Sequence, residues 1–288
     1  MWLYKFLSNL NHKRLDARSV RKLNERKKKL QSFGGFAKGL YVETKQGKFV
    51  VNPSDAFVAK SLLQKGAYGL HEIDLAKNYL NHSSVCLVLG GHIGSIAIPL
   101  SKLCGSVFVF EANPETFKYL SNNVLLNDCK NIELYNYAVS DSVGEISFIM
   151  QEANSGSSRR KPIYAFEPVS YEVGREIKVK TQVLDDVFQN LTPDLIFMDI
   201  EGSEYFALKG AQKLLSRTKV LIMEFDSGYF KKVSGKSAPE IWEVFAPHFS
   251  RLINPKYNLQ FDGKEAVKAE ILRMIDSDES HENIVFLK

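Results

Sequence analysis

Apolar residues occur in the central part of the chain as short continuous runs separated by stretches of helical periodicity. The first run, Val85–Leu89, ends at Gly90-Gly91, and a helical stretch then leads to a second run, Val107–Phe110. A short run that is apolar throughout, and is bounded by turn residues, predicts a strand buried on both faces. The order strand, helix, strand predicts a right-handed unit with two parallel strands.

The alternation of strands and helices continues to the end of the chain and predicts an α/β fold. Asn113 and Pro114 predict the cap and first residue of a helix that runs to about Asn127. Further strands are predicted at 132–137, 144–150, 177–182, within 193–202, and at 220–224, 251–253 and 283–287. Further helices are predicted at 203–215, from Pro239 through Phe245, and at about 264–275.

The part of the chain that precedes the first core strand has a different pattern. Residues 40–44 and 48–51 alternate on either side of a glycine turn and predict a β-hairpin. Residues 52–81 have helical spacing, broken by a glycine-containing joint at 66–72. Tyr68, His71 and Glu72 lie in this joint, and we expect them to reach a substrate or cofactor; purely structural roles are the alternative.

The glycine turn after the first strand predicts a nucleoside site. The carboxyl ends of parallel strands form the ligand crevice of such sheets, and Gly90, Gly91, Gly94 and Glu111 converge there. A dinucleotide fingerprint needs a glycine where this chain has Leu89. The pattern therefore favours a nucleoside without a pyrophosphate, such as S-adenosylmethionine, over a nicotinamide dinucleotide. A tight turn without a ligand is the structural alternative.

Two further segments are predicted to lie at the same edge of the sheet. Asn113 follows Glu111 by two residues, and Ala138-Val139-Ser140 ends the third predicted strand. Small side chains and backbone groups at the end of a strand suit a flat adenine ring. We therefore expect this rim to complete the cofactor site.

Carboxylates end two more of the predicted strands. Asp199 and Glu201 follow the apolar run 195–198, and Glu224 follows the run 220–223. With Glu111, three strands deliver acids to one edge of the sheet. The structural alternative is that Asp199 and Glu201 complement the dipole of the helix that begins at Ser203.

A long polar segment, 152–176, separates two of the predicted strands. Loops of this length in compact domains commonly bind ligands or cover a site. It contains Arg159 and Arg160, which we expect to meet an anionic substrate; a solvated charge run is the alternative.

The net charge of +5 is concentrated at the N-terminus. Residues 1–31 hold ten Lys or Arg and two acids, so that the remaining chain is mildly acidic. A basic segment with apolar residues at helical spacing suits an anionic membrane surface or a partner protein. Packing on the domain or on a second subunit, within a homo-oligomer, is the alternative. The acidic body argues against a nucleic-acid-binding face.

The cellular compartment is predicted from patterns that are absent from the sequence. No apolar run approaches the roughly 20 residues that span a bilayer, and the first residues lack the pattern of a secretory signal. The three cysteines have no metal-ligand spacing, which predicts inert thiols. These features predict a cytoplasmic protein, with attachment to the inner membrane face through residues 1–31.

Over residues 66–225 the sequence resembles the FkbM family of S-adenosylmethionine-dependent methyltransferases. The matching motifs stand in the family's order: Gly66-Ala67-Tyr68 with Glu72, Gly90-Gly91-His92-Ile93-Gly94, Glu111-Ala112-Asn113-Pro114-Glu115, Ala138-Val139-Ser140-Asp141, Leu184-Asp185-Asp186, Asp199-Ile200-Glu201-Gly202-Ser203-Glu204, Leu208-Lys209-Gly210-Ala211 and the predicted strand that ends at Glu224. The resemblance implies a Rossmann-like class I fold with a seven-stranded, mostly parallel sheet. It also implies a methyltransferase domain at 66–288 after an extension at 1–65.

The resemblance further implies transfer of a methyl group from S-adenosylmethionine to a hydroxyl oxygen of a sugar, a glycan or a secondary metabolite. Asp199 is then the general base, and Glu201 and Glu224 orient the acceptor. The same acids suit Mg²⁺ or Ca²⁺, but no metal is assigned. The family usually has Asp at position 88 and Asn at position 92, where this chain has Val88 and His92, and His92 is expected to contact the cofactor instead. A non-catalytic scaffold of the same fold is the alternative.

Overall fold

The computed structural model describes residues 36–164, 174–277 and 280–288, together with positions 21, 25, 28, 32 and 34. Residues 281 and 282 are described by their backbone alone. The predicted membrane or partner segment, 1–31, lies outside the described residues except at 21, 25 and 28. The described residues contain no helix that is long and apolar enough to span a bilayer.

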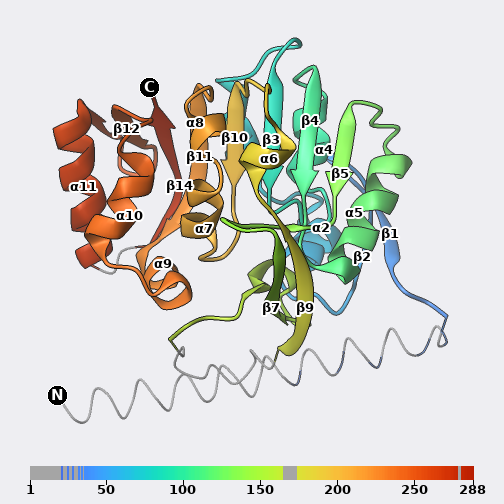
Figure 1. The fold of residues 1–288 in the computed structure, drawn as a ribbon. Coiled ribbons are helices and arrows are strands. Elements are labelled where there is room, and N and C mark those ends of the chain that lie inside the picture. The colour runs from blue at the N-terminus through green and yellow to red at the C-terminus, as the bar shows by residue number, and fades with distance from the viewer. Residues whose placement is uncertain are drawn as a thin grey trace.

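A twisted central sheet forms the middle layer of the structure (Figure 1). Its strands lie in the spatial order β13 (Leu259–Asp262), β12 (Arg251–Asn254), β14 (Ser280–Leu287), β11 (Val220–Asp226), β10 (Leu195–Met198), β3 (Val85–Leu89), β4 (Ser106–Phe110) and β5 (Ile132–Tyr135). The five strands from β11 to β5 are parallel, and β14 is antiparallel to β11 and to β12. The predicted α/β fold with a mostly parallel sheet is confirmed.

The sheet has eight strands, and the predicted number of seven is wrong by one. The additional strand is β13, which pairs with β12 in an antiparallel hairpin at the edge of the sheet. In β13 only Phe261 is partly buried, and the other three residues are exposed. Its four residues, Leu-Gln-Phe-Asp, alternate apolar and polar, but a run this short is only a weak strand signal.

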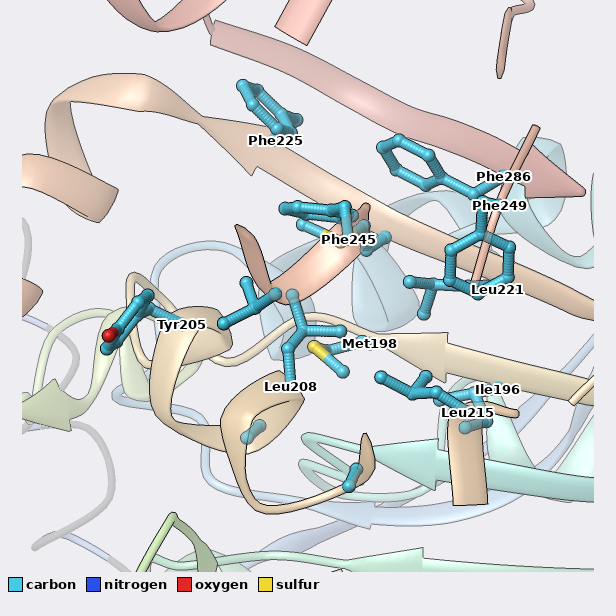
Figure 2. Close-up of a cluster of buried hydrophobic side chains, with 14 of the residues drawn as sticks. Ile196, Met198, Tyr205, Leu208, Leu215, Leu221, Phe225, Phe245, Phe249 and Phe286 are labelled. Carbon is cyan, nitrogen blue, oxygen red and sulfur yellow. The ribbon is translucent and has the colours of Figure 1, made fainter. Parts of the chain in front are cut away.

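One face of the sheet packs on a layer of helices from the second half of the chain. These are α6 (Leu184–Val187), α7 (Glu204–Lys209), α8 (Gln212–Leu215), α9 (Ser227–Ser234), α10 (Ala238–Phe245) and α11 (Lys264–Asp276). Figure 2 shows the core between them, where Leu221 and Phe286 from the sheet meet Leu208 and Phe245 from the helices. Burial of each large apolar side chain contributes about 1.5–3 kcal/mol, so this layer fixes the strands in register.

The opposite face packs on elements from the first half of the chain. These are the β1 (Leu40–Thr44) and β2 (Gly47–Val51) hairpin, α2 (Val58–Lys65), α3 (Leu70–Lys77), α4 (Ala97–Ser101) and α5 (Pro114–Leu126). Successive residues of β3 alternate between the two layers, because Cys86 and Val88 enter this core while Leu87 and Leu89 enter the other. The predicted hairpin, and the prediction of strands buried on both faces, are confirmed.

A small second sheet lies below the carboxyl ends of the central strands (Figure 1). Its spatial order is β6 (Ala138–Val139), β9 (Arg175–Gln182), β7 (Gly144–Met150) and β8 (Arg159–Arg160). The predicted pairing of 144–150 with 177–182 is confirmed, and it is antiparallel. This sheet closes one side of the space into which the central strands point.

The single helix predicted at 203–215 is two short helices, α7 and α8. At Gly210 the chain passes so close to the Ser140 carbonyl that an added Cβ would lie 2.1 Å from its oxygen. Asp185 accepts hydrogen bonds from the amides of Lys213 and Leu214, which begin α8. The contact at Gly210 and the Asp185 cap belong to tertiary packing, so the local periodicity did not predict the break.

Candidate active site

A cavity of about 410 Å³ opens at the carboxyl ends of β3, β4 and β10. Its volume lies in the range of small-molecule sites, and such sites are expected at this edge of an α/β sheet. It is lined by residues from the joint, the glycine turn, the strand ends and the small sheet, among them Tyr68, Gly90, Gly91, His92, Glu111, Ala138, Val139, Asp199 and Glu201. These nine predicted site residues therefore meet in one cavity.

The glycine turn is shaped by a close approach between two strands. Gly90 has φ +92°, and an added Cβ would lie 1.8 Å from the backbone oxygen of Asp199. The amides of Gly90 and Gly91 both donate to the Phe110 carbonyl, at 3.0 and 2.9 Å. The turn therefore holds the ends of β3, β4 and β10 together, and these amides are used within the protein.

Glu111 is buried at the floor of the cavity, with 8% of its surface exposed. One carboxylate oxygen accepts from the His92 amide at 2.8 Å, and the other accepts from the Asn113 amide at 2.7 Å. Burial raises the pKa of Glu111 to about 7, against the lowering effect of these two hydrogen bonds. A carboxylate offers about four acceptor positions, so two remain for a ligand.

The small sheet and the neighbouring rim give the cavity an apolar side. An apolar slot of the cavity is lined by Phe110 of β4, by Tyr137, by Val139 of β6, and by Ile146 and Phe148 of β7. Phe148 and Val139 are buried, and Tyr137 is half-buried. This slot is next to Glu111 and suits a flat aromatic ligand group.

A cluster of carboxyl groups faces the other side. Asp199, Glu201 and Glu224 each place a carboxylate oxygen within 4.8 Å of the others, and Asp199 and Glu201 line the cavity itself. Asp199 keeps an exposed surface toward the cavity, although protein surrounds it closely enough for desolvation to raise its pKa. The prediction that strand-end acids converge is confirmed by the geometry.

Asp199 and Glu224 are joined by a side-chain hydrogen bond. Burial raises the pKa of Glu224 far above its ordinary value, and the charges of Asp199, Glu201 and Glu204 raise it further. Glu224 is therefore protonated at neutral pH and donates to Asp199. Two close carboxyls that share one proton are the arrangement expected when like charges cannot both be ionised.

Glu204 is a buried acid that was not among the predicted site residues. It is 2% exposed, and its Oε1 accepts from the Ile200 amide at 3.2 Å. Burial raises the pKa of Glu204 to about 8, and the charge of Asp199 also raises it. Glu201 has φ +54°, and burial followed by the charges of Asp199 and Glu204 raises its pKa.

Tyr68 places its ring in the cavity wall close to these acids. Burial raises the pKa of its phenol, and the charges of Asp199, Glu72 and Glu201 raise it further. The phenol therefore remains protonated and can donate a hydrogen bond. His71 and Glu72 do not line the cavity, because they belong to the first turn of α3 rather than to the joint.

A chain of hydrogen bonds closes another part of the cavity wall. Ser155 donates from its hydroxyl to Asp55 Oδ2 at 2.6 Å, and the His92 ring lies 2.7 Å from the same hydroxyl. Asp55 also accepts the amides of Phe57 and Ala59 at the start of α2. Ser155 and Asp55 are 100 residues apart, so no local pattern in the sequence connects them.

The remaining predicted cofactor residues form hydrogen bonds within the protein near the cavity. Asn113 caps α5, as predicted, by accepting from the amides of Glu115 and Thr116. Ser140 is fully buried and accepts from Arg160 Nη2 at 2.8 Å. Gly94 lies in the turn that leads to α4, and its amide donates to the Gly91 carbonyl. None of the three is among the residues that line the cavity.

The two predicted substrate arginines are held by protein groups in β8. Arg159 is 4% exposed, donates to the Ser157 carbonyl and lies 5.3 Å from the Tyr229 ring centroid. Arg160 stacks on Phe206, with 3.8 Å from its Cζ to the ring centroid, and burial lowers its pKa. Neither lines the cavity, although the charge of Arg159 lowers the pKa of Glu201. The alternative of a solvated charge run does not apply to either residue.

Among characterised proteins, the chain is similar to the hexuronic acid methyltransferase AglP of Haloferax volcanii. The two are 29% identical over 143 residues, which is 49% of this chain and 55% of AglP. The match thus spans about half the length of each protein.

Solved structures of methyltransferases also show a distant similarity to this chain. The methyltransferase FkbM of Methylobacillus flagellatus is 15% identical, with a TM-score of 0.41 over 72% of this chain and 44% of its own. The precorrin-6y C5,15-methyltransferase of Geobacter metallireducens is 16% identical, with a TM-score of 0.39 over 76% of this chain and 87% of its own.

The family assignment rests on the sequence of the sheet and site region itself. The family model of the methyltransferase FkbM domain matches residues 89–252, which is more than half of the chain. The matched range begins at the end of β3, and it includes the glycine turn, Glu111 and the cluster of acids. The chain belongs to the family of proteins with a methyltransferase FkbM domain.

Proposed function

We propose that this protein transfers a methyl group from S-adenosylmethionine to a hydroxyl oxygen of a sugar or glycan. The proposal rests on one observation: a single cavity is lined by Glu111, a buried carboxyl group that can accept hydrogen bonds from a ribose, and by the carboxyl groups of Asp199 and Glu201. The cavity thus offers a place for a nucleoside beside a place for proton removal.

The residues present fit S-adenosylmethionine. Glu111 retains two acceptor positions after its bonds to the amides of His92 and Asn113, and a ribose has two hydroxyls to donate. The apolar slot that includes Val139 and Phe148 would hold the adenine ring. The acidic cluster would favour the positive charge of the sulfonium and of the amino group.

The same features disfavour a nicotinamide dinucleotide. A pyrophosphate needs free backbone amides at the glycine turn, yet the amides of Gly90 and Gly91 donate to Phe110 and that of His92 donates to Glu111. Asp199 and Glu201 would also repel a pyrophosphate. The dehydrogenase alternative is therefore weaker than methyl transfer.

When bound, S-adenosylmethionine supplies a methyl group that is already electrophilic, so the protein has to align the acceptor oxygen and remove its proton. Asp199 is suited to this step, because it directly follows β10 and lines the cavity with an exposed side chain. Its raised pKa brings it closer to neutral pH, where a general base works best. Glu224 donates to Asp199 and holds its carboxylate in place.

The acceptor class is proposed from the chemistry of the lining. Asp199, Glu201 and the Tyr68 phenol provide several acceptors and a donor around one region of the cavity, which suits a molecule with several neighbouring hydroxyls. The similarity to a hexuronic acid methyltransferase supports a sugar acceptor. A sugar that is part of a larger glycan would have to reach the cavity from its open side.

The test combines a binding measurement with a product measurement on the full chain. Calorimetry with S-adenosylhomocysteine should show binding, and incubation with S-adenosylmethionine and a panel of hexuronic acids and neutral hexoses should give a product heavier by one methyl group. Binding without product on any sugar would direct the search to other hydroxyl compounds. Absence of binding by the folded protein would favour the non-catalytic scaffold, and binding of NADH would favour the dehydrogenase.

A further inference from the structure

We propose that Gln46, in the turn of the N-terminal hairpin, is a positioning residue for the active site because it fixes Tyr68 in the cavity wall. This inference rests on the proposed function for the reaction that it affects. Gln46 lies well before the range matched by the family model, 89–252. The inference therefore assigns part of the active-site architecture to the hairpin.

Gln46 forms a buried bridge between two parts of the cavity wall. It is 4% exposed; its Oε1 accepts from the Tyr68 amide at 2.8 Å, and its Nε2 donates to the Ser95 carbonyl at 2.5 Å. Both Tyr68 and Ser95 line the cavity, on the joint and on the segment after the glycine turn. The side-chain amide thus uses both of its polar ends to hold the joint against the glycine turn.

The joint needs hydrogen bonds from other elements because its two glycines allow many backbone conformations. Gly66 and Gly69 stand on either side of Ala67-Tyr68, with φ of +63° and +70°. Glycine adopts this region without steric cost and leaves the segment between with little local preference. The position of Tyr68 is therefore set by contacts with other elements rather than by the neighbouring sequence.

Other bonds attach the same joint to the hairpin and to α2. The Lys45 amide donates to the Gly66 carbonyl at 2.9 Å, and the Ser61 hydroxyl donates to the Ala67 carbonyl at 2.8 Å. Both of these bonds hold residues that precede Tyr68. Gln46 is the residue that holds the Tyr68 backbone itself and connects it to the glycine turn.

The consequence for the site follows from where the Tyr68 phenol lies. Tyr68 lines the same cavity as Asp199 and Glu201, and its pKa is raised first by burial and then by their charges. A shift of the joint would move the phenol relative to the proposed base and to an acceptor bound between them. Displacement by about 1 Å of a group that aligns reactants can reduce the rate about a hundredfold.

The experiment uses the full chain with Gln46→Met, which fills the space without either hydrogen bond, and Gln46→Leu as a second replacement should the first not fold. The matched control is Asn127→Ala. Asn127 also makes two hydrogen bonds to the hairpin, with the amide and the carbonyl of Lys48, but it lies away from the cavity. The control therefore weakens hairpin docking without touching Tyr68.

Two readouts separate positioning from general destabilisation. Hydrogen exchange at the Tyr68 amide should accelerate in Gln46→Met and remain unchanged in Asn127→Ala. The kcat for methyl transfer should fall about tenfold or more in Gln46→Met, and by less than about twofold in the control. In a chain that already carries Tyr68→Phe, adding Gln46→Met should lower kcat by less than about threefold. The reason is that the effects of coupled residues are not additive.

Equal losses of kcat in Gln46→Met and Asn127→Ala would overturn the proposal, as would independent, multiplicative effects of Gln46→Met and Tyr68→Phe. A wild-type protein without methyl transfer would overturn the proposed function. In that case two measurements on the same variants still test whether Gln46 fixes the cavity wall: hydrogen exchange at the Tyr68 amide and binding of S-adenosylhomocysteine. Unchanged hydrogen exchange in Gln46→Met would refute this role of Gln46.

Discussion

Asp199 directly follows β10, and a hydrogen bond joins its carboxyl group to that of Glu224 in the neighbouring parallel strand β11, which continues to Asp226 instead of ending at Glu224 as predicted. The register pairs Met198 with Met223, so the next residue of each strand brings a carboxyl group to the same edge of the sheet. Burial and the surrounding acids keep the proton on Glu224, which leaves Asp199 as the carboxylate. The pair thus supplies a base whose position is fixed by the sheet.

The first prediction concerns this base. Asp199→Asn should retain binding of S-adenosylhomocysteine and lower kcat by about 100-fold or more, because general bases contribute about 10²–10⁴. Glu224→Gln is the matched variant: its amide can still donate to Asp199, so its loss should be much smaller. Full activity in Asp199→Asn, measured by mass spectrometry of the product, would refute the assignment of the base.

The second prediction is a pH dependence of cofactor binding. With the pKa of Glu111 at about 7, the free protein carries a protonated Glu111 in acid, whereas two ribose hydroxyls require the carboxylate. The affinity for S-adenosylhomocysteine should therefore rise about tenfold from pH 6 to pH 8. Glu111→Gln should bind more weakly and lose this dependence in calorimetry, while Glu111→Ala should lose about 1.5–3 kcal/mol of binding free energy. An equally steep pH profile in Glu111→Gln would assign the titration to another group.

The third prediction concerns stability. The pKa of Glu204 is about 8 in the folded protein and near 4.5 in the unfolded chain, so the folded state holds the proton more tightly. Its contribution to stability is complete below about pH 4.5 and is lost as the pH rises through about 8. Between pH 5 and pH 8 the free energy of unfolding, measured in urea, should fall less for Glu204→Gln than for wild type. The difference should be about 3–5 kcal/mol. Identical slopes for the two proteins would mean that Glu204 ionises normally.

The fourth prediction concerns metal dependence. Asp199, Glu201 and Glu224 form an oxygen donor set that suits Mg²⁺ or Ca²⁺. The proposed reaction nevertheless needs no cation, because Asp199 itself accepts the proton. Activity should therefore persist after treatment with EDTA and change little when Mg²⁺ is restored. Loss of activity in EDTA and recovery with Mg²⁺ would assign the three acids to a cation instead.

The fifth prediction concerns the basic N-terminal segment. Ten Lys or Arg residues lie within residues 1–31, and each basic residue near an anionic surface contributes about 1 kcal/mol. The full chain should sediment with anionic liposomes at low salt and be released at high salt, whereas a chain that begins at Phe36 should stay in solution. If both chains behave alike, the segment has a structural or subunit-contact role.

The sequence by itself determined the elements whose signal is local. The apolar runs of β3, β10 and β11, the Asn113 cap of α5 and the acids that end the strands all depend on residues that are neighbours along the chain. Because these strands are parallel, their carboxyl ends lie at the same edge of the sheet. For this reason local patterns, together with the family resemblance in the case of His92, were sufficient to predict nine of the residues that meet in the cavity.

Only the tertiary structure decided the features that depend on contacts between distant segments. The break between α7 and α8 results from the approach of Gly210 to Ser140, and β13 forms only because β12 is there to pair with it. The bridges from Gln46 to Tyr68 and from Asp55 to Ser155 span 22 and 100 residues. Side-chain hydrogen bonds of this kind, and the burial that raises the pKa of Glu111 and Glu224, exist only once the layers have packed, so no periodicity or motif in the sequence encodes them.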